Sequence, residues 1–195
     1  MIETINPVVH GGNRSDYRKS IALHSLGATV SAGLLGAALG AIGALLRAPW
    51  GDTGLTCVAA VAIAYAAREL LGIPVPLLDR KRQVPDWWRT FYSPPIAALL
   101  YGVGLGVGFL TFITFGTFVA VAAAAVASGD PLIGALMCAP FGAARAAAVA
   151  LAVATDRAHP ADVVDRLETV ARSRAARWIN GAALTAIAAT SGWLR

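Results

Sequence analysis

The chain has 195 residues, of which 57% are hydrophobic and only 14% are charged. A soluble domain carries about 25% charged residues, so this chain has too little polar surface for a water-soluble fold of its size. The formal charge of +5 comes from basic residues in short segments between apolar stretches. That distribution excludes a nucleic-acid-binding patch and indicates a membrane protein.

Five apolar regions are the expected membrane spans, because a spanning helix needs about 20 mostly apolar residues. We therefore expect an all-α fold, a polytopic membrane helix bundle of about five spans that forms a single transmembrane domain over residues 1–195. The expected segments are a cytoplasmic N-terminal segment at 1–20 and spans at about 21–46, 53–73, 95–128, 131–155 and 178–194.

The third apolar region is too long for one straight span. Its roughly 34 residues would extend about 51 Å as a single helix, so we expect a broken helix there. Three threonines and a glycine lie near its middle, where they can unwind a helix and satisfy the freed backbone groups. These candidate functional residues are Thr111, Thr114, Gly116 and Thr117.

Charge placement predicts the orientation. Three basic segments alternate with short connectors that carry few charges. The basic residues are Arg14, Arg18 and Lys19 in the first segment, Arg80, Lys81, Arg82 and Arg89 in the second, and Arg157, Arg166, Arg172, Arg174 and Arg177 in the third. If the broken region counts as one crossing, all three segments share the cytoplasmic side of a prokaryotic inner membrane. The N-terminus is then cytoplasmic and the C-terminus external.

The last basic segment also shows helical periodicity. Val163, Val164, Leu167 and Val170 recur at helical spacing in residues 156–177, and charged residues occupy the positions between them. This pattern is typical of an interfacial amphipathic helix, which we expect on the cytoplasmic surface.

Arg145 and Glu69 are the charged candidates for a functional site. Arg145 is the only charge well inside a predicted span, and Glu69 lies near the inner end of its own span. Charges inside a membrane usually face a partner or a wet interior, so Glu69 is the partner that we propose for Arg145. The alternative is that the long Arg145 side chain reaches the inner headgroups.

The two cysteines are candidates for a redox pair. Cys57 and Cys138 lie at predicted depths that differ by only about 4–5 Å, although cysteines in apolar helices also serve as small hydrophobic residues. The three histidines are scattered without metal-ligand spacing, so we predict no metal site. No enzyme constellation and no cofactor motif stands out in the sequence.

The stretch from Tyr101 to Gly116, with glycine at every second position from Gly102 to Gly108, is followed by an Ala/Val run, Gly129-Asp130 and another apolar helix. This arrangement resembles the cytochrome c biogenesis transmembrane family, which includes CcdA and the membrane domain of DsbD. The resemblance implies six spans in two inverted halves that pass reducing equivalents across the membrane, with the first span lacking here. That family places a cysteine beside prolines at each helix break, whereas this chain has Thr111-Phe112-Ile113-Thr114. No redox residue is therefore carried over.

Three functions follow as hypotheses. The resemblance implies a membrane protein of thiol/disulfide electron transfer or cytochrome c assembly that works with a membrane or redoxin-like protein partner in the lipid bilayer. The second hypothesis is a small-solute or metal-ion permease. The third is a non-catalytic subunit of a larger membrane complex.

Overall fold

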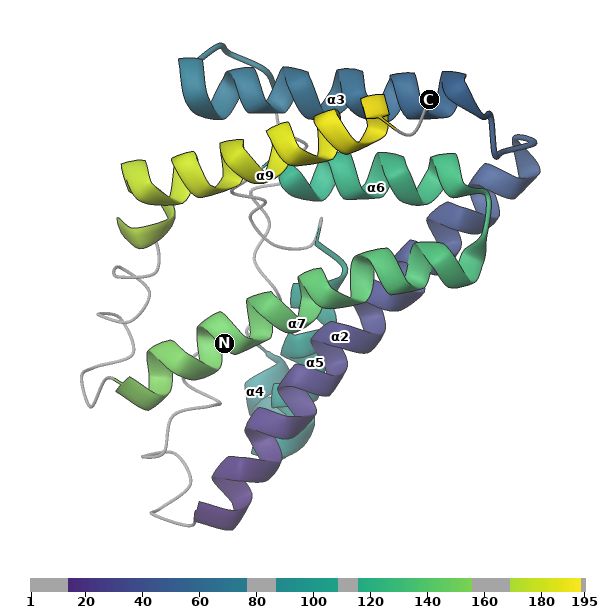
Figure 1. The fold of residues 1–195 in the computed structure, drawn as a ribbon. Coiled ribbons are helices and arrows are strands. Elements are labelled where there is room, and N and C mark those ends of the chain that lie inside the picture. The colour runs from purple at the N-terminus through teal and green to yellow at the C-terminus, as the bar shows by residue number, and fades with distance from the viewer. Residues whose placement is uncertain (1–13, 77–86, 109–115, 156–168, 194–195) are drawn as a thin grey trace. The chain divides into compact units, whose positions relative to one another are not determined.

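The computed structural model describes residues 14–76, 87–108, 116–155 and 169–193, and all regular secondary structure in these ranges is helical. The all-α prediction is therefore confirmed for the described part of the chain. The helices are α2 (Arg14–Leu45), α3 (Asp52–Leu71), α4 (Trp88–Phe91), α5 (Pro94–Gly106), α6 (Thr117–Ser128), α7 (Pro131–Thr155) and α9 (Arg174–Trp193), as labelled in Figure 1.

Three of the described helices contain segments long and apolar enough to cross a membrane, namely Ser15–Leu45, Asp52–Leu71 and Pro131–Leu151. Large apolar side chains on them are exposed, as expected of a lipid-facing surface; Leu34 on α2 is 66% exposed and Leu136 on α7 is 65% exposed. Two further apolar helices, α5 and α6, are shorter. Membrane association is thus supported, while the count of five spans stays a prediction.

The first helix extends beyond the span predicted at 21–46. We expected the span to begin at residue 21, where the apolar run begins, but α2 already begins at Arg14. Hydropathy marks the part of a helix that lies in lipid, and a helix continues beyond it wherever its backbone hydrogen bonds do. Asp16 in the first turn complements the helix dipole and lies 3.2 Å from the Lys19 ammonium group.

Glycine and aspartate define the other helix boundaries. Gly72 and Gly129 end α3 and α6 with φ of 74° and 61°, a left-handed conformation that glycine adopts without steric cost. Asp130 then begins α7, because its carboxylate accepts hydrogen bonds from the backbone N–H groups of Leu132 and Ile133 at 2.7 and 3.0 Å.

The long third region is occupied by two helices and not by one. α5 ends at Gly106, Gly108 has φ of 74°, and α6 begins at Thr117. These two helix ends agree with a broken helix, although α5 ends a few residues before the expected position. The centre of the expected break, including Thr111 and Thr114, lies outside the described residues, as does most of the surface helix expected at 156–177.

The chain divides into two compact units. Unit 1 comprises Met1–Ala32, Arg80–Phe112 and Ala139–Thr169, and unit 2 comprises Gly33–Asp79, Ile113–Cys138 and Val170–Arg195. Each unit therefore draws on three separate parts of the sequence, and both α2 and α7 contribute to both units.

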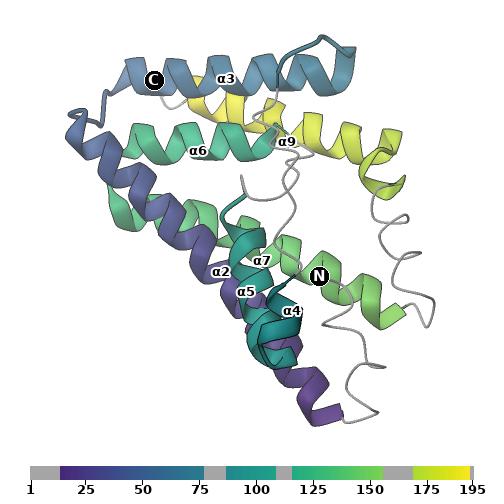
Figure 2. The ribbon, with the colours of Figure 1, turned by 180° about the vertical axis from the view of Figure 1, so that it is seen from behind.

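In unit 1, the first half of α2 packs closely against α5 and the second half of α7. A Cβ atom at Gly102 of α5 would overlap the backbone carbonyl of His24, and one at Gly142 of α7 would overlap that of Ala28. Figure 2 shows α5 lying along this part of α2. Such contacts between small residues replace the hydrophobic drive for association that lipid does not supply.

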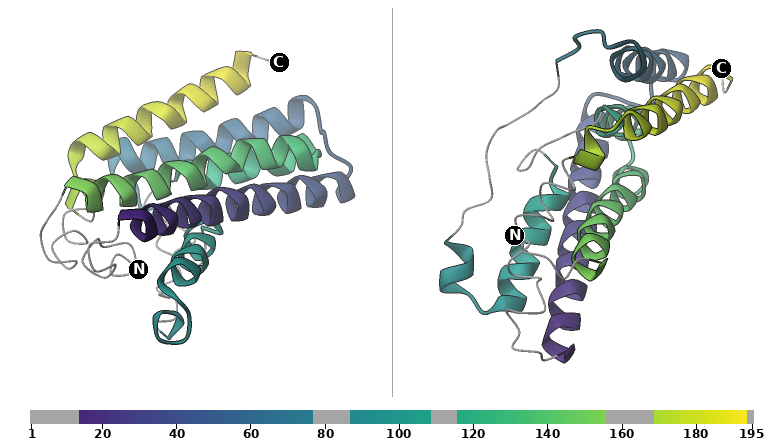
Figure 3. Two further views of the ribbon diagram at one scale, coloured as in Figure 1. Left: turned by 90° about the horizontal axis from the view of Figure 1, so that it is seen from below. Right: turned by 90° about the vertical axis from the view of Figure 1, so that its left-hand side faces the viewer.

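In unit 2, α3, α6 and α9 lie side by side, as Figure 1 and Figure 3 show. The buried residues between them are Ala62, Tyr65, Ala66, Ala120 and Leu184. The second half of α2 approaches the beginning of α7 through glycines on both helices, because a Cβ atom at either Gly36 or Gly134 would overlap the backbone carbonyl of the other. Unit 2 thus holds the beginning of α6, where the candidate site lies.

Candidate functional site

The beginning of α6 carries a part-buried polar contact between two helices of unit 2. The Thr117 hydroxyl, in the first turn of α6, donates a hydrogen bond to the side-chain Oδ1 of Asn180 on α9. Asn180 is only 8% exposed, and its Nδ2 atom has no hydrogen-bond partner. A buried amide donor without a partner is costly in an apolar environment, which marks this position as unusual.

Gly116 brings α3 close to the same point. A Cβ atom at Gly116 would lie 2.5 Å from the Cβ and ring atoms of Tyr65 on α3, so a larger residue would push the two apart. The Tyr65 hydroxyl donates to the backbone carbonyl of Pro76 at 2.9 Å. Tyr65 therefore holds the segment that follows α3 beside the beginning of α6. We call Tyr65, Gly116, Thr117 and Asn180 the α6 cluster.

An ion pair follows one turn farther along α3. The Arg68 Nη1 atom lies 2.7 Å from Oε1 of Glu69, and the Arg68 Nε atom donates to the carbonyl of Val75 at 3.1 Å. The Glu69 side chain is 3% exposed and that of Arg68 is 29% exposed. A buried carboxylate is stable only when it is paired and hydrogen-bonded, and here its neighbour Arg68 provides the charge.

Of the predicted site residues, Gly116 and Thr117 meet in the α6 cluster, and Glu69 lies on the α3 helix that contributes Tyr65. The sequence interpretation missed Asn180, Tyr65 and Arg68. Asn180 had a signal that could have found it, because it is an isolated amide side chain within the apolar stretch 178–194.

Arg145 has a different environment, in unit 1. Its Nη1 atom donates to the backbone carbonyl of Leu105 at 3.0 Å, and its guanidinium carbon lies 5.4 Å from the centre of the Phe141 ring. Leu105 is in the last turn of α5, where carbonyl groups have no partner within the helix and a cation is favourable. Arg145 thus caps α5. Its proposed pairing with Glu69 stays a prediction, and the partner that the structure gives Glu69 is Arg68.

The two cysteines are not joined by a disulfide and differ in exposure. Cys57 is exposed on α3, whereas Cys138 is fully buried on α7, beside Gly36. Among the residues that the structure describes, no group of three or more His, Cys, Asp or Glu side chains could hold a metal ion.

No protein-family model and no solved structure matches the chain. Several curated proteins do, and each is a methylamine utilization protein MauF. The protein from Paracoccus versutus is 36% identical over 117 residues, which cover 59% of this chain and 43% of the relative. Those from Methylorubrum extorquens and Paracoccus denitrificans are 35% and 32% identical over 130 and 112 residues, covering 66% and 57% of this chain and 46% and 40% of the relative.

The chain thus matches less than half the length of these relatives. The relatives also show that the resemblance to the cytochrome c biogenesis transmembrane family was wrong, because the similar proteins are MauF proteins. The resemblance rested on a pattern of glycine and alanine in apolar helices. Closely packed membrane helices share this pattern whatever their family, since small residues allow their backbones to approach.

Proposed function

We propose that this chain is a multi-pass membrane protein that serves methylamine utilization as an accessory protein, acting through a protein partner. The observation that carries the proposal is the similarity to proteins named for methylamine utilization, at 32–36% identity over 108–132 residues. The helices long enough to cross a membrane support a membrane location.

The α6 cluster is our candidate for the working centre. Polar groups within membrane spans are costly and tend to be functional. Thr117 and Asn180, which are 63 positions apart, form such a polar contact where the long third region resumes as α6; it is part-buried. Such a contact at a helix beginning combines polar groups with a backbone whose first N–H groups lack intrahelical partners. We propose that the partner acts on or through this point.

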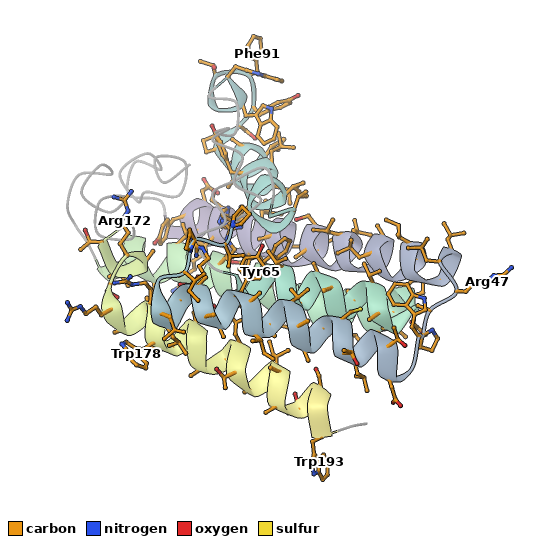
Figure 4. All side chains as sticks on the ribbon, turned by 90° about the horizontal axis from the view of Figure 1, so that it is seen from above. Arg47, Tyr65, Phe91, Arg172, Trp178 and Trp193 are labelled. Atoms are coloured by element: carbon orange, nitrogen blue, oxygen red, sulfur yellow. The ribbon has the colours of Figure 1, made fainter. Side chains whose placement is uncertain are left out.

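For the topology we retain five spans in an inner membrane, with a cytoplasmic N-terminus and α9 as the last span. Support comes from the tryptophans near the two ends of α9, Trp178 and Trp193, which are 63% and 86% exposed and project away from the helix in Figure 4. Their 15-residue separation corresponds to about 22 Å along the helix. Exposed tryptophans at both ends of a helix are typical of interfacial anchors.

Deletion of the gene in its own host tests the proposal. We expect loss of growth with methylamine, normal growth on other substrates, and recovery when the chain is returned. Asn180→Leu should not restore growth, because it removes the amide that binds Thr117. Thr190→Ala, also on α9, should restore it, because the exposed Thr190 hydroxyl bonds only within its own helix, to Ala186 and Ile187.

Immunoblots of the membrane fraction must show both variants at wild-type level for this comparison to count. Normal growth of the deletion strain on methylamine would overturn the proposed function. Full complementation by Asn180→Leu would overturn only the assignment of the α6 cluster as its working centre.

A further inference from the structure

A group of aromatic side chains surrounds the short helix α4 in unit 1. The Trp87 ring is at its centre, with ring centres 6.3 Å from Trp88 and 5.9 Å from Phe91, both edge to face. The Tyr92 ring centre lies 6.5 Å from that of Trp87. One turn of backbone sets this spacing, because the Phe91 N–H donates to the Trp87 carbonyl at 3.2 Å. We call Trp87, Trp88, Phe91 and Tyr92 the α4 aromatic cluster.

Trp88 joins the cluster to α5, and the other three rings are exposed. The Trp88 ring centre lies 5.7 Å from that of Tyr101 on α5, which is only 1% exposed. Trp87 is 51% exposed, Tyr92 is 42% exposed and Phe91 is 78% exposed. The Phe91 ring projects away from α4 and α5 in Figure 4. Edge-to-face contacts hold the rings together, so the cluster presents an ordered aromatic surface to its surroundings.

The cluster lies where the chain enters an apolar helix. Ser93 precedes α5, which begins at Pro94 and continues without a charged residue to Gly106, a rise of about 20 Å. Tryptophan and tyrosine combine an apolar ring with a polar N–H or O–H group, and they are enriched where the hydrocarbon of a membrane meets its headgroups. An aromatic cluster at the end of an apolar helix therefore fits the headgroup level of a bilayer.

Basic residues close to the cluster indicate which headgroups it fits. Residues 79–89 contain four basic residues and two acidic ones, namely Arg80, Lys81, Arg82 and Arg89 against Asp79 and Asp86. Arg89 belongs to α4 itself. Arg82 comes five residues before Trp87, so the covalent chain keeps the two Cα atoms within about 18 Å of each other. Lysine and arginine beside a membrane are attracted to anionic lipids.

We propose that the α4 aromatic cluster and these basic residues form a binding site for the headgroup of an anionic phospholipid. The exposed rings lie at the level of the headgroups, and the neighbouring cations bind the lipid phosphate. The aromatic rings favour a bilayer surface in general, and the excess of basic residues gives the preference for anionic lipid. The inference is independent of the proposed function and of the side of the membrane on which α4 lies.

Quenching of tryptophan fluorescence by brominated lipids tests the site. Two chains with a single tryptophan are made by replacing the other four with phenylalanine, which keeps an aromatic ring; one retains Trp87 and the other retains Trp193, which is 86% exposed on α9. Each is placed in phosphatidylcholine nanodiscs with increasing amounts of brominated phosphatidylglycerol or brominated phosphatidylcholine. One basic residue beside an anionic surface contributes a factor of about five. Half-quenching of Trp87 should therefore need about 3- to 10-fold less brominated phosphatidylglycerol than brominated phosphatidylcholine, whereas Trp193 should respond equally to both.

Two pairs of substitutions separate the charges from the rings. Arg80→Gln with Arg82→Gln in the chain that retains Trp87 should reduce the preference to within about twofold of none, while neutral lipid still quenches. Arg174→Gln with Arg177→Gln is the matched control, because both arginines are exposed on α9, and it should leave the preference unchanged.

Two results would overturn the proposal. Absence of quenching at Trp87 by either lipid would show that the rings do not meet the bilayer, and equal quenching by both would show lipid contact without an anionic site. If circular dichroism shows that the single-tryptophan chains do not fold, the lipid that the unaltered chain retains decides. After extraction from equimolar nanodiscs, native mass spectrometry should find more phosphatidylglycerol than phosphatidylcholine bound, and Arg80→Gln with Arg82→Gln should abolish the excess. Equal retention by the unaltered chain would overturn the site.

Discussion

Replacing Arg68 by methionine tests whether the buried Glu69 carboxylate depends on its neighbour. Met keeps much of the length of the side chain but removes the charge that lies 2.7 Å from Oε1 of Glu69. Loss of one partner of a fully buried ion pair costs about 3–5 kcal/mol, because the other charge is left unpaired. Here Arg68 is 29% exposed, so water partly replaces it, and we expect a loss of about 2–3 kcal/mol in the free energy of unfolding.

Glu69→Gln separates the charge from the packing. It removes the carboxylate but keeps an amide of the same shape, so its cost should be about 1 kcal/mol. In the double variant no unpaired charge remains, and the combined loss should be smaller than the sum of the single losses by about 1–2 kcal/mol. Denaturation by SDS in mixed micelles, followed by circular dichroism, measures all three variants.

Arg177→Met is the matched control, because Arg177 is an exposed arginine on α9 and its replacement should change stability by less than about 0.5 kcal/mol. A neutral or stabilising Arg68→Met would refute the reasoning, since it would mean that Glu69 needs no positive partner. Strictly additive losses would also refute it, because they would show that the two side chains are not coupled.

Gly102→Val should destabilise the protein by about 1–3 kcal/mol, because its Cβ would overlap the His24 carbonyl. Gly54→Ala should be tolerated, because the nearest atom to its Cβ would be 3.6 Å away. Thermal denaturation compares the two variants. Arg145→Met should cost about 1–2 kcal/mol through loss of the bond to the Leu105 carbonyl. Its effect should add to that of Glu69→Gln, and a measured coupling would instead favour the predicted Arg145–Glu69 pair. A topology reporter fused after Arg195 should indicate the outside, and a reporter inserted at Lys81 should indicate the cytoplasm. A cytoplasmic C-terminus would contradict the model of five spans.

Much of the helical layout could be predicted because apolar runs end at residues that stop helices. The expected spans at 53–73 and 131–155 correspond to α3 at Asp52–Leu71 and α7 at Pro131–Thr155. Gly72 ends the first, and Gly129 with Asp130 separates the second from α6. These boundaries depend on local backbone preferences, which a single sequence contains.

The positions that were missed depend on hydrogen bonds and packing. Hydropathy cannot distinguish a polar turn that is helical from one that is not, so the apolar run from residue 21 did not reveal that the helix itself begins at Arg14. In the long third region, the break was expected at Thr111 to Thr117, and its centre lies outside the described residues. The described end of α5 lies at Gly106, where the glycines themselves reach a left-handed conformation at Gly108.

Partners across helices could not be predicted because nothing local specifies them. Thr117 meets Asn180 only because α6 and α9 pack together, and Arg145 reaches Leu105 only because unit 1 brings α5 and α7 to the same part of α2. Glu69 was assigned a distant partner because it lies near the inner end of its own predicted span. In the structure, the long Arg68 side chain folds back to both Glu69 and Val75.

In unit 1, the close approach of α2 and α5 accounts for both the glycine packing and the buried polar groups. Gly27 and Gly102 allow the backbones of α2 and α5 to touch, and that close approach brings the Ala98 carbonyl within reach of the His24 ring. The same closeness leaves no donor beside Nε2 of His24 or the Ser20 hydroxyl. A sequence selected only for tight packing would place alanine or leucine at these two positions, which lose nothing on burial.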